Sequence, residues 1–146
     1  MPEAPTIQVE IVSAEGEIFS GQASAVFVPG SQGELGIWPR HAPLLSLLKV
    51  GEVRVQTPDG QQHFYFVSGG ALEVQPHKVT VLADTALHAR DIDEAAALAA
   101  KQRAEEALAD RGAHVTLAEA QAELAHLAQA IAQLRLIDRM REHHRG

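Results

Sequence analysis

Residues 51–67 have the sequence GEVRVQTPDGQQHFYFV, in which two extended segments flank a turn. In 53–56, valine alternates with a polar residue, and this period of two is typical of a half-buried β-strand. The tetrapeptide Thr-Pro-Asp-Gly at 57–60 is a turn sequence, because proline fixes φ and Asp-Gly accepts a positive φ. We therefore predict a β-hairpin here.

The same alternation recurs on both sides of this hairpin. Near the N-terminus, Ile7, Val9 and Ile11 alternate with other residues, and 72–74 and 79–81 repeat the pattern. Glycine and proline mark turns between these segments. The turns are at 15–16, 29–30, 32–33, 68–70 and 75–77. About eight to ten short strands at this spacing predict an antiparallel β-sandwich or barrel.

The composition changes near residue 87 of the 146-residue chain. All seven prolines lie at or before Pro76, and all six aromatic residues precede residue 67. Between Ala95 and Ala132 the chain contains 16 alanines instead, a composition that favours helix. We predict an α+β protein, with a β-sandwich domain in 1–86 and a helical domain in 87–146.

The helical domain is predicted to be an antiparallel hairpin of two helices. Asp91, with Glu94 three residues later, is expected to cap the first helix, which would stop near Gly112. Thr116 and Glu119 give the second helix a closer match to the same signal. Apolar positions predict the packed faces: Ala97, Ala100, Ala104, Ala107 and Leu108 on the first helix, and Leu117, Ala120, Leu124, Leu127, Ile131 and Leu134 on the second. Alanine buries little area, so at roughly 25 cal/mol per Å² the helices are held only weakly.

The overall composition excludes several classes of protein. The formal net charge of −7 argues against binding to nucleic acid or to anionic lipid. The absence of cysteine removes disulfides, thiolate metal sites and cysteine nucleophiles. No apolar run is long enough to span a bilayer, and the acidic N-terminus is unlike a signal or transit peptide. We expect an intracellular protein that meets a membrane only through partners.

No catalytic, metal or cofactor site is predicted. The segment 30–36, GSQGELG, lacks the Gly-Lys-Ser/Thr of a phosphate-binding loop and is interpreted as a turn. The eight histidines include no H-x-x-x-H pair, and no nucleophile motif is present. The basic C-terminal residues Arg135, Arg139 and Arg141 have two interpretations. They stabilise the helix C-terminus and solubility, or they contact an acidic partner.

Short motifs along almost the whole chain form one ordered set. They are VSAE at 12–15, FSG at 19–21, GELGI at 33–37, HAPLL at 41–45, SGG at 68–70, LEV at 72–74, VTVLAD at 79–84, AELA at 122–125 and QLR at 133–135. In this order the motifs resemble the epsilon-subunit family of the bacterial F-type ATP synthase. The resemblance implies a non-catalytic rotor subunit of the central stalk, with a β-sandwich followed by a helical hairpin.

The resemblance also implies partners for the sandwich. In this family the sandwich binds the gamma subunit and lies beside the c-ring, which it approaches with the loop around the Gly-Glu-Leu-Gly segment. On this chain the corresponding residues are Ser31, Gln32, Gly33 and Glu34, with His41 nearby. An acidic Glu34 is expected to pair with a basic residue on a c-subunit loop.

The helical hairpin of the family is implied to be a regulatory arm. When folded it permits ATP hydrolysis, and when extended along gamma it reaches the alpha and beta subunits and inhibits hydrolysis. Arg135, Arg139 and Arg141 would then face an acidic segment of beta. A thin alanine–leucine contact suits such a switch, since modest forces can shift a small energy gap.

Two departures from the family pattern are present. Some members bind ATP through an Ile/Leu-Asp-x-x-Arg-Ala motif, but residues 92–97 place Ala96 where that arginine would be, so tight ATP binding is not expected. Arg40 stands where the family usually has glycine.

The resemblance implies a location on the cytoplasmic side of the bacterial inner membrane. The alternative is a stand-alone β-sandwich binding module with a helical interaction arm.

Overall fold

The computed structural model describes residues 4–109 and 116–145. The chain divides into two compact units, Met1–His88 and Ala89–Gly146. The division falls two residues after the predicted boundary between 86 and 87. The reason is a short strand, β10 (Ala86–His88), which pairs with β7 (Gln62–Val67) and so belongs to the first unit.

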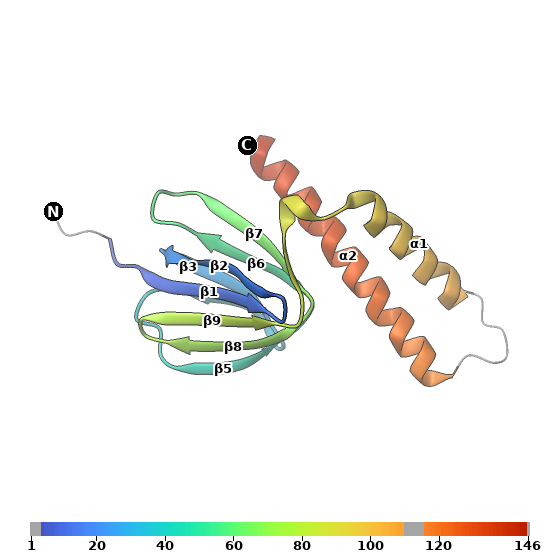
Figure 1. Ribbon diagram of the computed structural model, residues 1–146, viewed down its shortest axis with the longest axis horizontal. Helices are drawn as coiled ribbons and strands as arrows, with labels where there is room; N and C mark the ends of the chain where they lie inside the picture. The colour runs from blue at the N-terminus through green and yellow to red at the C-terminus, as the bar shows by residue number, and fades with distance from the viewer. Residues whose placement is uncertain (1–3, 110–115, 146) are drawn as a thin grey trace. The chain divides into compact units, whose positions relative to one another are not determined.

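The described part of the first unit contains ten β-strands (Figure 1). Besides β7 and β10 these are β1 (Ile7–Ser13), β2 (Gly16–Ala23), β3 (Ala25–Gly30), β4 (Gly33–Ile37), β5 (Leu44–Leu48), β6 (Gly51–Gln56), β8 (Gly70–Gln75) and β9 (Lys78–Ala83). Their order is β10-β7-β6-β3-β5-β8-β9-β1-β2, with β4 on the other side of β3. β3 meets β5 at a single residue pair, Gly30 with Leu48, so the sheet folds into two layers there.

The two layers enclose one hydrophobic core. Ile7, Val9 and Ile11 of β1 are completely buried, as the alternating pattern predicts. They join the inward-facing residues of the opposite layer, among them Val53 and Val55 of β6, in a single cluster. The predicted β-sandwich of about eight to ten strands is therefore confirmed.

One strand pair departs from the predicted antiparallel arrangement. β1 pairs with β9 in parallel, from Gln8 with Lys78 to Val12 with Leu82. Parallel neighbours need a long connection, and here that connection consists of the intervening strands. Neither alternation nor turn chemistry carries information about such a distant pairing.

The predicted hairpin of β6 and β7 is present with its turn at 57–60. Gly60 has a φ of 87°, and its N–H donates to the Thr57 carbonyl at 3.0 Å. The Thr57 hydroxyl donates to the Asp59 carboxylate and, with the Gln61 amide, lowers the pKa of that carboxyl. Because the pKa is lowered on folding, this contribution to stability is present above the ordinary pKa of aspartate and is lost as the pH falls through the folded value.

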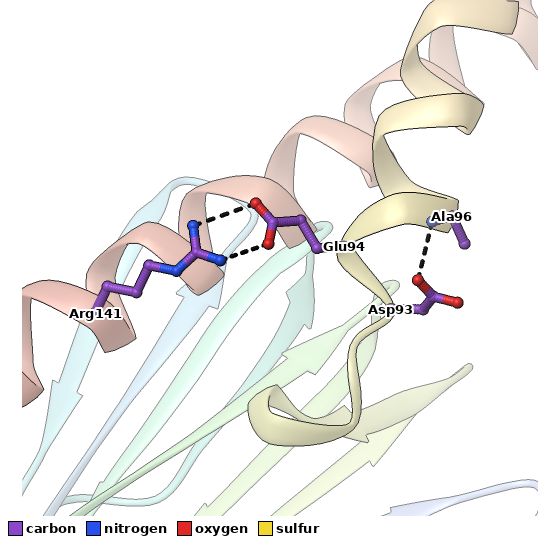
Figure 2. A network of polar contacts seen from close by, with 4 residues as sticks. All are labelled: Asp93, Glu94, Ala96 and Arg141. Carbon is purple, nitrogen blue, oxygen red and sulfur yellow. Dashed lines mark hydrogen bonds and ion pairs between the residues drawn. The ribbon is translucent and has the colours of Figure 1, made fainter.

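The second unit, which we call the arm, contains a 3₁₀ turn, η1 (Ala89–Asp91), followed by α1 (Glu94–Ala109) and the antiparallel α2 (Leu117–Arg145). The predicted capping role of Asp91 is wrong, because Asp91 lies in η1. The cap is Asp93, whose Oδ1 accepts a hydrogen bond of 3.0 Å from the Ala96 N–H (Figure 2). The predicted stop at Gly112 lies outside the described residues.

The predicted start of α2 is confirmed. The Thr116 hydroxyl oxygen accepts a hydrogen bond of 3.1 Å from the Glu119 N–H, which satisfies one of the free donors of the first turn. From there the helix continues for 29 residues, nearly twice the 16 of α1.

The packed face predicted for α1 is confirmed in part, but the one predicted for α2 is wrong. Ala97 and Ala104 of α1 are buried, as expected. Leu117 and Leu124, which we predicted in the packed face of α2, are 75% and 54% exposed. The buried residues of α2 are instead Ala130, Leu136 and Ile137, and the exposed leucines leave apolar surface on the arm.

Candidate interaction surfaces

The predicted contact segment is the turn between β3 and β4. Ser31 and Gln32 are exposed at its tip, and Gly33 has a φ of 133°, which favours glycine. The Ser31 N–H donates to the Leu47 carbonyl at 2.9 Å, which attaches the turn to β5. The turn is thus an exposed, polar projection held against β5.

Glu34 already has a partner within the chain. Its carboxylate lies 3.8 Å from the guanidinium of Arg54, which also lies 3.7 Å from Glu52. The Arg54 guanidinium is stacked over the Phe27 ring, 4.3 Å from the centroid. A basic residue of another protein could reach the largely exposed Glu34 only in competition with Arg54.

The structure does not bring His41 together with the turn at 31–34. β4 runs away from that turn, and His41 follows it in a loop where the His41 N–H donates to the Trp38 carbonyl at 3.2 Å. The loop is tied by the Arg40 N–H to the Pro76 carbonyl, 2.8 Å away in the turn after β8. His41 therefore lies at the opposite end of the sandwich.

The backbone conformation at Arg40 accounts for the glycine that is usual in the family at this position. Its φ is 67°, a left-handed conformation that costs a side chain roughly 1 kcal/mol. We expect Arg40→Gly to raise the free energy of unfolding by up to about 1 kcal/mol in urea denaturation, since glycine removes the strain but adds chain entropy. As a control, Lys49→Gly, at a position without positive φ, should lower stability. A destabilised Arg40→Gly variant would contradict this explanation.

The sequence predicted that the free sandwich exposes an apolar surface but did not locate it, and the structure places it on the second layer. Leu45 and Leu47 of β5 are 77% and 68% exposed. Leu47 pairs with Ala71 of β8, which pairs with the exposed Leu82 of β9, so the leucines line one outer face. We call Leu45, Leu47 and Leu82 the leucine face. The signal was present in the run LLSLL at 44–48, which is apolar on both faces of its strand.

The three predicted arginines of the arm lie on α2. Arg135 and Arg139 are exposed. Arg141 forms a two-pronged ion pair with Glu94 at the start of α1, with N–O distances of 3.2 and 2.5 Å (Figure 2). Hydrogen bonding to Glu94 raises the pKa of Arg141 above its already high ordinary value. The pair joins the first turn of α1 to the last turns of α2.

The residues of the degraded nucleotide motif have other partners. Ala96 carries no charge, and its N–H is used by Asp93. Glu94 is engaged by Arg141. Within 4–109 and 116–145, no group of three potential metal ligands is assembled, and no helix has the length and apolarity needed to cross a membrane.

Two family models together cover most of the chain. The model described as ATP synthase, delta/epsilon chain, beta-sandwich domain matches residues 6–89, and the long alpha-helix domain of the same chain matches residues 90–138. The chain belongs to the ATP synthase delta/epsilon family. The two matches meet within two residues of the boundary between the compact units.

Close relatives in this family are ATP synthase epsilon chains. The epsilon chain of Nitrosococcus oceani is 64% identical over 139 residues, which cover 95% of this chain and 97% of the relative. The epsilon chain of Alkalilimnicola ehrlichii is 58% identical over 136 residues, covering 93% and 95%. The predicted family is confirmed, and the chain is accordingly a subunit of the ATP synthase.

Solved structures of the ATP synthase share the fold. A chain of the Euglena gracilis mitochondrial enzyme, in a cryo-EM structure of OSCP, F1 and the c-ring, matches with a TM-score of 0.78 at 19% identity, covering 90% of this chain and 80% of that one. A chain of the Tetrahymena thermophila central stalk and c-ring matches with a TM-score of 0.63 at 11% identity, covering 93% and 99%. The predicted order of sandwich and helices is thus that of ATP synthase subunits.

Proposed function

We propose that the chain is a non-catalytic rotor subunit in the central stalk of the proton-translocating ATP synthase. One observation carries this proposal: the chain forms two compact units, a sandwich with an exposed leucine face and a two-helix arm, and each unit matches its own family model. The sandwich binds gamma and the c-ring, while the arm reaches alpha and beta. The chain itself has no active site and takes no cofactor.

The leucine face supplies the contact with gamma. Exposed leucines gain about 25 cal/mol for each Å² of apolar surface removed from water, and they are depleted from surfaces that stay wet. The polar turn with Ser31, Gln32 and Glu34 lies beside this face and is the part that meets the c-ring loops. There a basic c-subunit residue would share Glu34 with Arg54.

Co-purification with gamma tests the proposal. The chain and the gamma subunit of the same synthase, expressed together with a tag on gamma alone, are expected to elute as one stable binary complex. Separate elution would instead favour the stand-alone binding module with a helical interaction arm. The assembled enzyme would lie on the cytoplasmic face of the bacterial inner membrane, held there by its partners.

The arm acts as the inhibitor of ATP hydrolysis. The buried residues of α1 are two alanines, Ala97 and Ala104, so α1 itself exposes little apolar area when the helices separate. Extended along gamma, α2 would present Arg135, Arg139 and Arg141 to an acidic segment of beta. Since Ala96 provides no cation for phosphate, ATP does not control this arm.

Truncation after Arg90 is expected to relieve inhibition. It removes α1 and α2 but leaves β10 and the whole sandwich. ATP hydrolysis by the assembled synthase should rise about sixfold if the inhibited form is favoured by about 1 kcal/mol, while ATP-driven proton pumping stays coupled. Unchanged hydrolysis by a synthase shown to contain the truncated subunit would remove the regulatory role of the arm.

The pair of Glu94 and Arg141 should favour the closed hairpin. Glu94→Gln breaks the two-pronged contact and frees Arg141, so the extended arm becomes more populated and hydrolysis is expected to fall by about twofold. Glu105→Gln, on an exposed position of the same helix, is the matched control and should leave the rate unchanged. Faster hydrolysis by Glu94→Gln would contradict a closing role for the pair.

A further inference from the structure

The edge of β5 that points away from β8 is only partly occupied. The Ser31 N–H donates to the Leu47 carbonyl and the Lys49 N–H donates to the Pro29 carbonyl, both at 2.9 Å. Because N–H and C=O of one residue point to the same side of a strand and alternate along it, residues 45, 47 and 49 all face the β3 side. β3 pairs with β5 only at Leu48.

The backbone groups of Leu45 therefore lie on an open edge. Among the described residues, the bonds from Ser31 and to Pro29 are the backbone hydrogen bonds that join β5 to a segment on this side. These two bonds do not use the N–H and C=O of Leu45 or the N–H of Leu47, which lie beyond the end of β3. Leu45 is also the most exposed large apolar residue in the described chain, at 77%.

An open edge with exposed leucines is a template for another strand. The flanks of this edge are protected in the usual way, by Pro43 before the strand and Lys49 after it, but its centre is not. A hollow of about 460 Å³ adjoins the start of the strand and could receive a side chain of an added segment. It is lined by Pro43, Leu44, Leu45, Glu73, Val74 and Gln75.

We propose that gamma docks on this chain by adding an extended, apolar segment as a strand on the open edge of β5. The backbone of that segment pairs with Leu45 and Leu47, and its alternate side chains cover the leucine face. This inference rests on the proposed function, in which gamma binds the sandwich. It specifies the chemistry of the contact, which is backbone hydrogen bonding as well as apolar burial.

Two variants at one position separate these contributions. Leu45→Pro removes both the leucine side chain and the open-edge N–H, whereas Leu45→Ala removes the side chain alone. Proline is tolerated where the N–H of an edge strand faces outward, and Leu44 before it is already extended. We expect the Kd for purified gamma to be at least about tenfold higher for Leu45→Pro than for Leu45→Ala. Equal affinities of the two variants would overturn strand addition.

Hydrogen exchange of the unmodified full-length chain gives an answer that does not depend on the folding of a variant. In the complex with gamma, the amides of Leu45 and Leu47 should exchange at least about tenfold more slowly than in the free chain. A complex in which these amides exchange as before would overturn the inference while leaving the proposed function intact. Failure of the unmodified chain to bind gamma would instead overturn the proposed function.

A second copy of the chain is the competing occupant of the edge. Sedimentation of the free chain is expected to show a monomer at concentrations at which gamma binds. A stable dimer that Leu45→Pro dissociates and Leu45→Ala does not would assign the edge to self-association and would overturn its assignment to gamma.

Discussion

Replacing Leu45 and Leu47 together by aspartate is expected to weaken binding of gamma by at least about 100-fold. Each leucine is more than two-thirds exposed in the free chain and would be covered in the complex. Burial of one leucine side chain contributes roughly 1.5–3 kcal/mol, and the two together exceed the roughly 2.7 kcal/mol that corresponds to 100-fold. Isothermal titration of the variant with purified gamma measures the change.

The free variant should remain folded, because both substituted side chains point outward. Leu87→Asp is the matched control, since Leu87 is also an exposed leucine on a strand but lies on β10, outside the leucine face. It is expected to bind gamma as the unmodified chain does. If Leu45→Asp/Leu47→Asp binds gamma with unchanged affinity, the leucine face has been assigned to the wrong partner.

Gly70→Ala is expected to prevent stable folding of the sandwich. A Cβ on Gly70 would lie 2.0 Å from the Leu82 carbonyl oxygen and 2.9 Å from the Ala83 Cα, both backbone atoms of the neighbouring strand β9. Its φ of 132° adds strain for any side chain. Relief requires separation of β8 from β9 in the core, so a loss of more than about 4 kcal/mol is expected.

Gly16→Ala is the control for this prediction. Gly16 has nearly the same φ, 130°, but a Cβ there would meet no atom within 4 Å. The free energy of unfolding of Gly16→Ala, measured by urea denaturation, should therefore fall only by the cost of the backbone strain, about 1–3 kcal/mol. Equal losses for Gly70→Ala and Gly16→Ala would show that the close approach of β8 and β9 does not limit stability.

Most strands could be predicted because the alternation of buried and exposed residues, and the turn residues at their ends, are local features of the sequence. Ile7, Val9 and Ile11 alternate because one face of β1 is buried, and Pro58 with Gly60 specify a turn without help from distant residues. β5 was harder, because both of its faces are apolar and no alternation marks which one is inside. An exposed Leu47 has the same sequence signature as a buried one.

Contacts between distant residues could not be predicted from local patterns. Glu94 was expected to act in a cap, but it pairs with Arg141, 47 positions away along the chain. Asp93 is the cap because Asp91 lies in the 3₁₀ turn η1 and not at the start of α1. The partner of a side chain such as Glu94 depends on which element packs next to it in the folded chain. The spacing of residues in the sequence does not contain that information.

The candidate contact surface was predicted in part. The resemblance grouped His41 with the turn at 31–34, yet the length of β4 separates them. It also left Glu34 without an internal partner, whereas Arg54 from β6 reaches it across β3. The positive φ of Arg40 was not predicted either, although the family usually has glycine at that position.

Direct observation of rotation is the sharpest test of a rotor subunit. The chain has no cysteine, so Gln61→Cys, at an exposed position beside the β6–β7 turn, provides a single site for attaching a bead. With the catalytic head of alpha, beta and gamma fixed to a surface through beta, the bead is expected to turn when ATP is added. A bead that stays still on this chain, while a probe on gamma in the same preparation turns, would contradict a place for the chain on the rotating shaft.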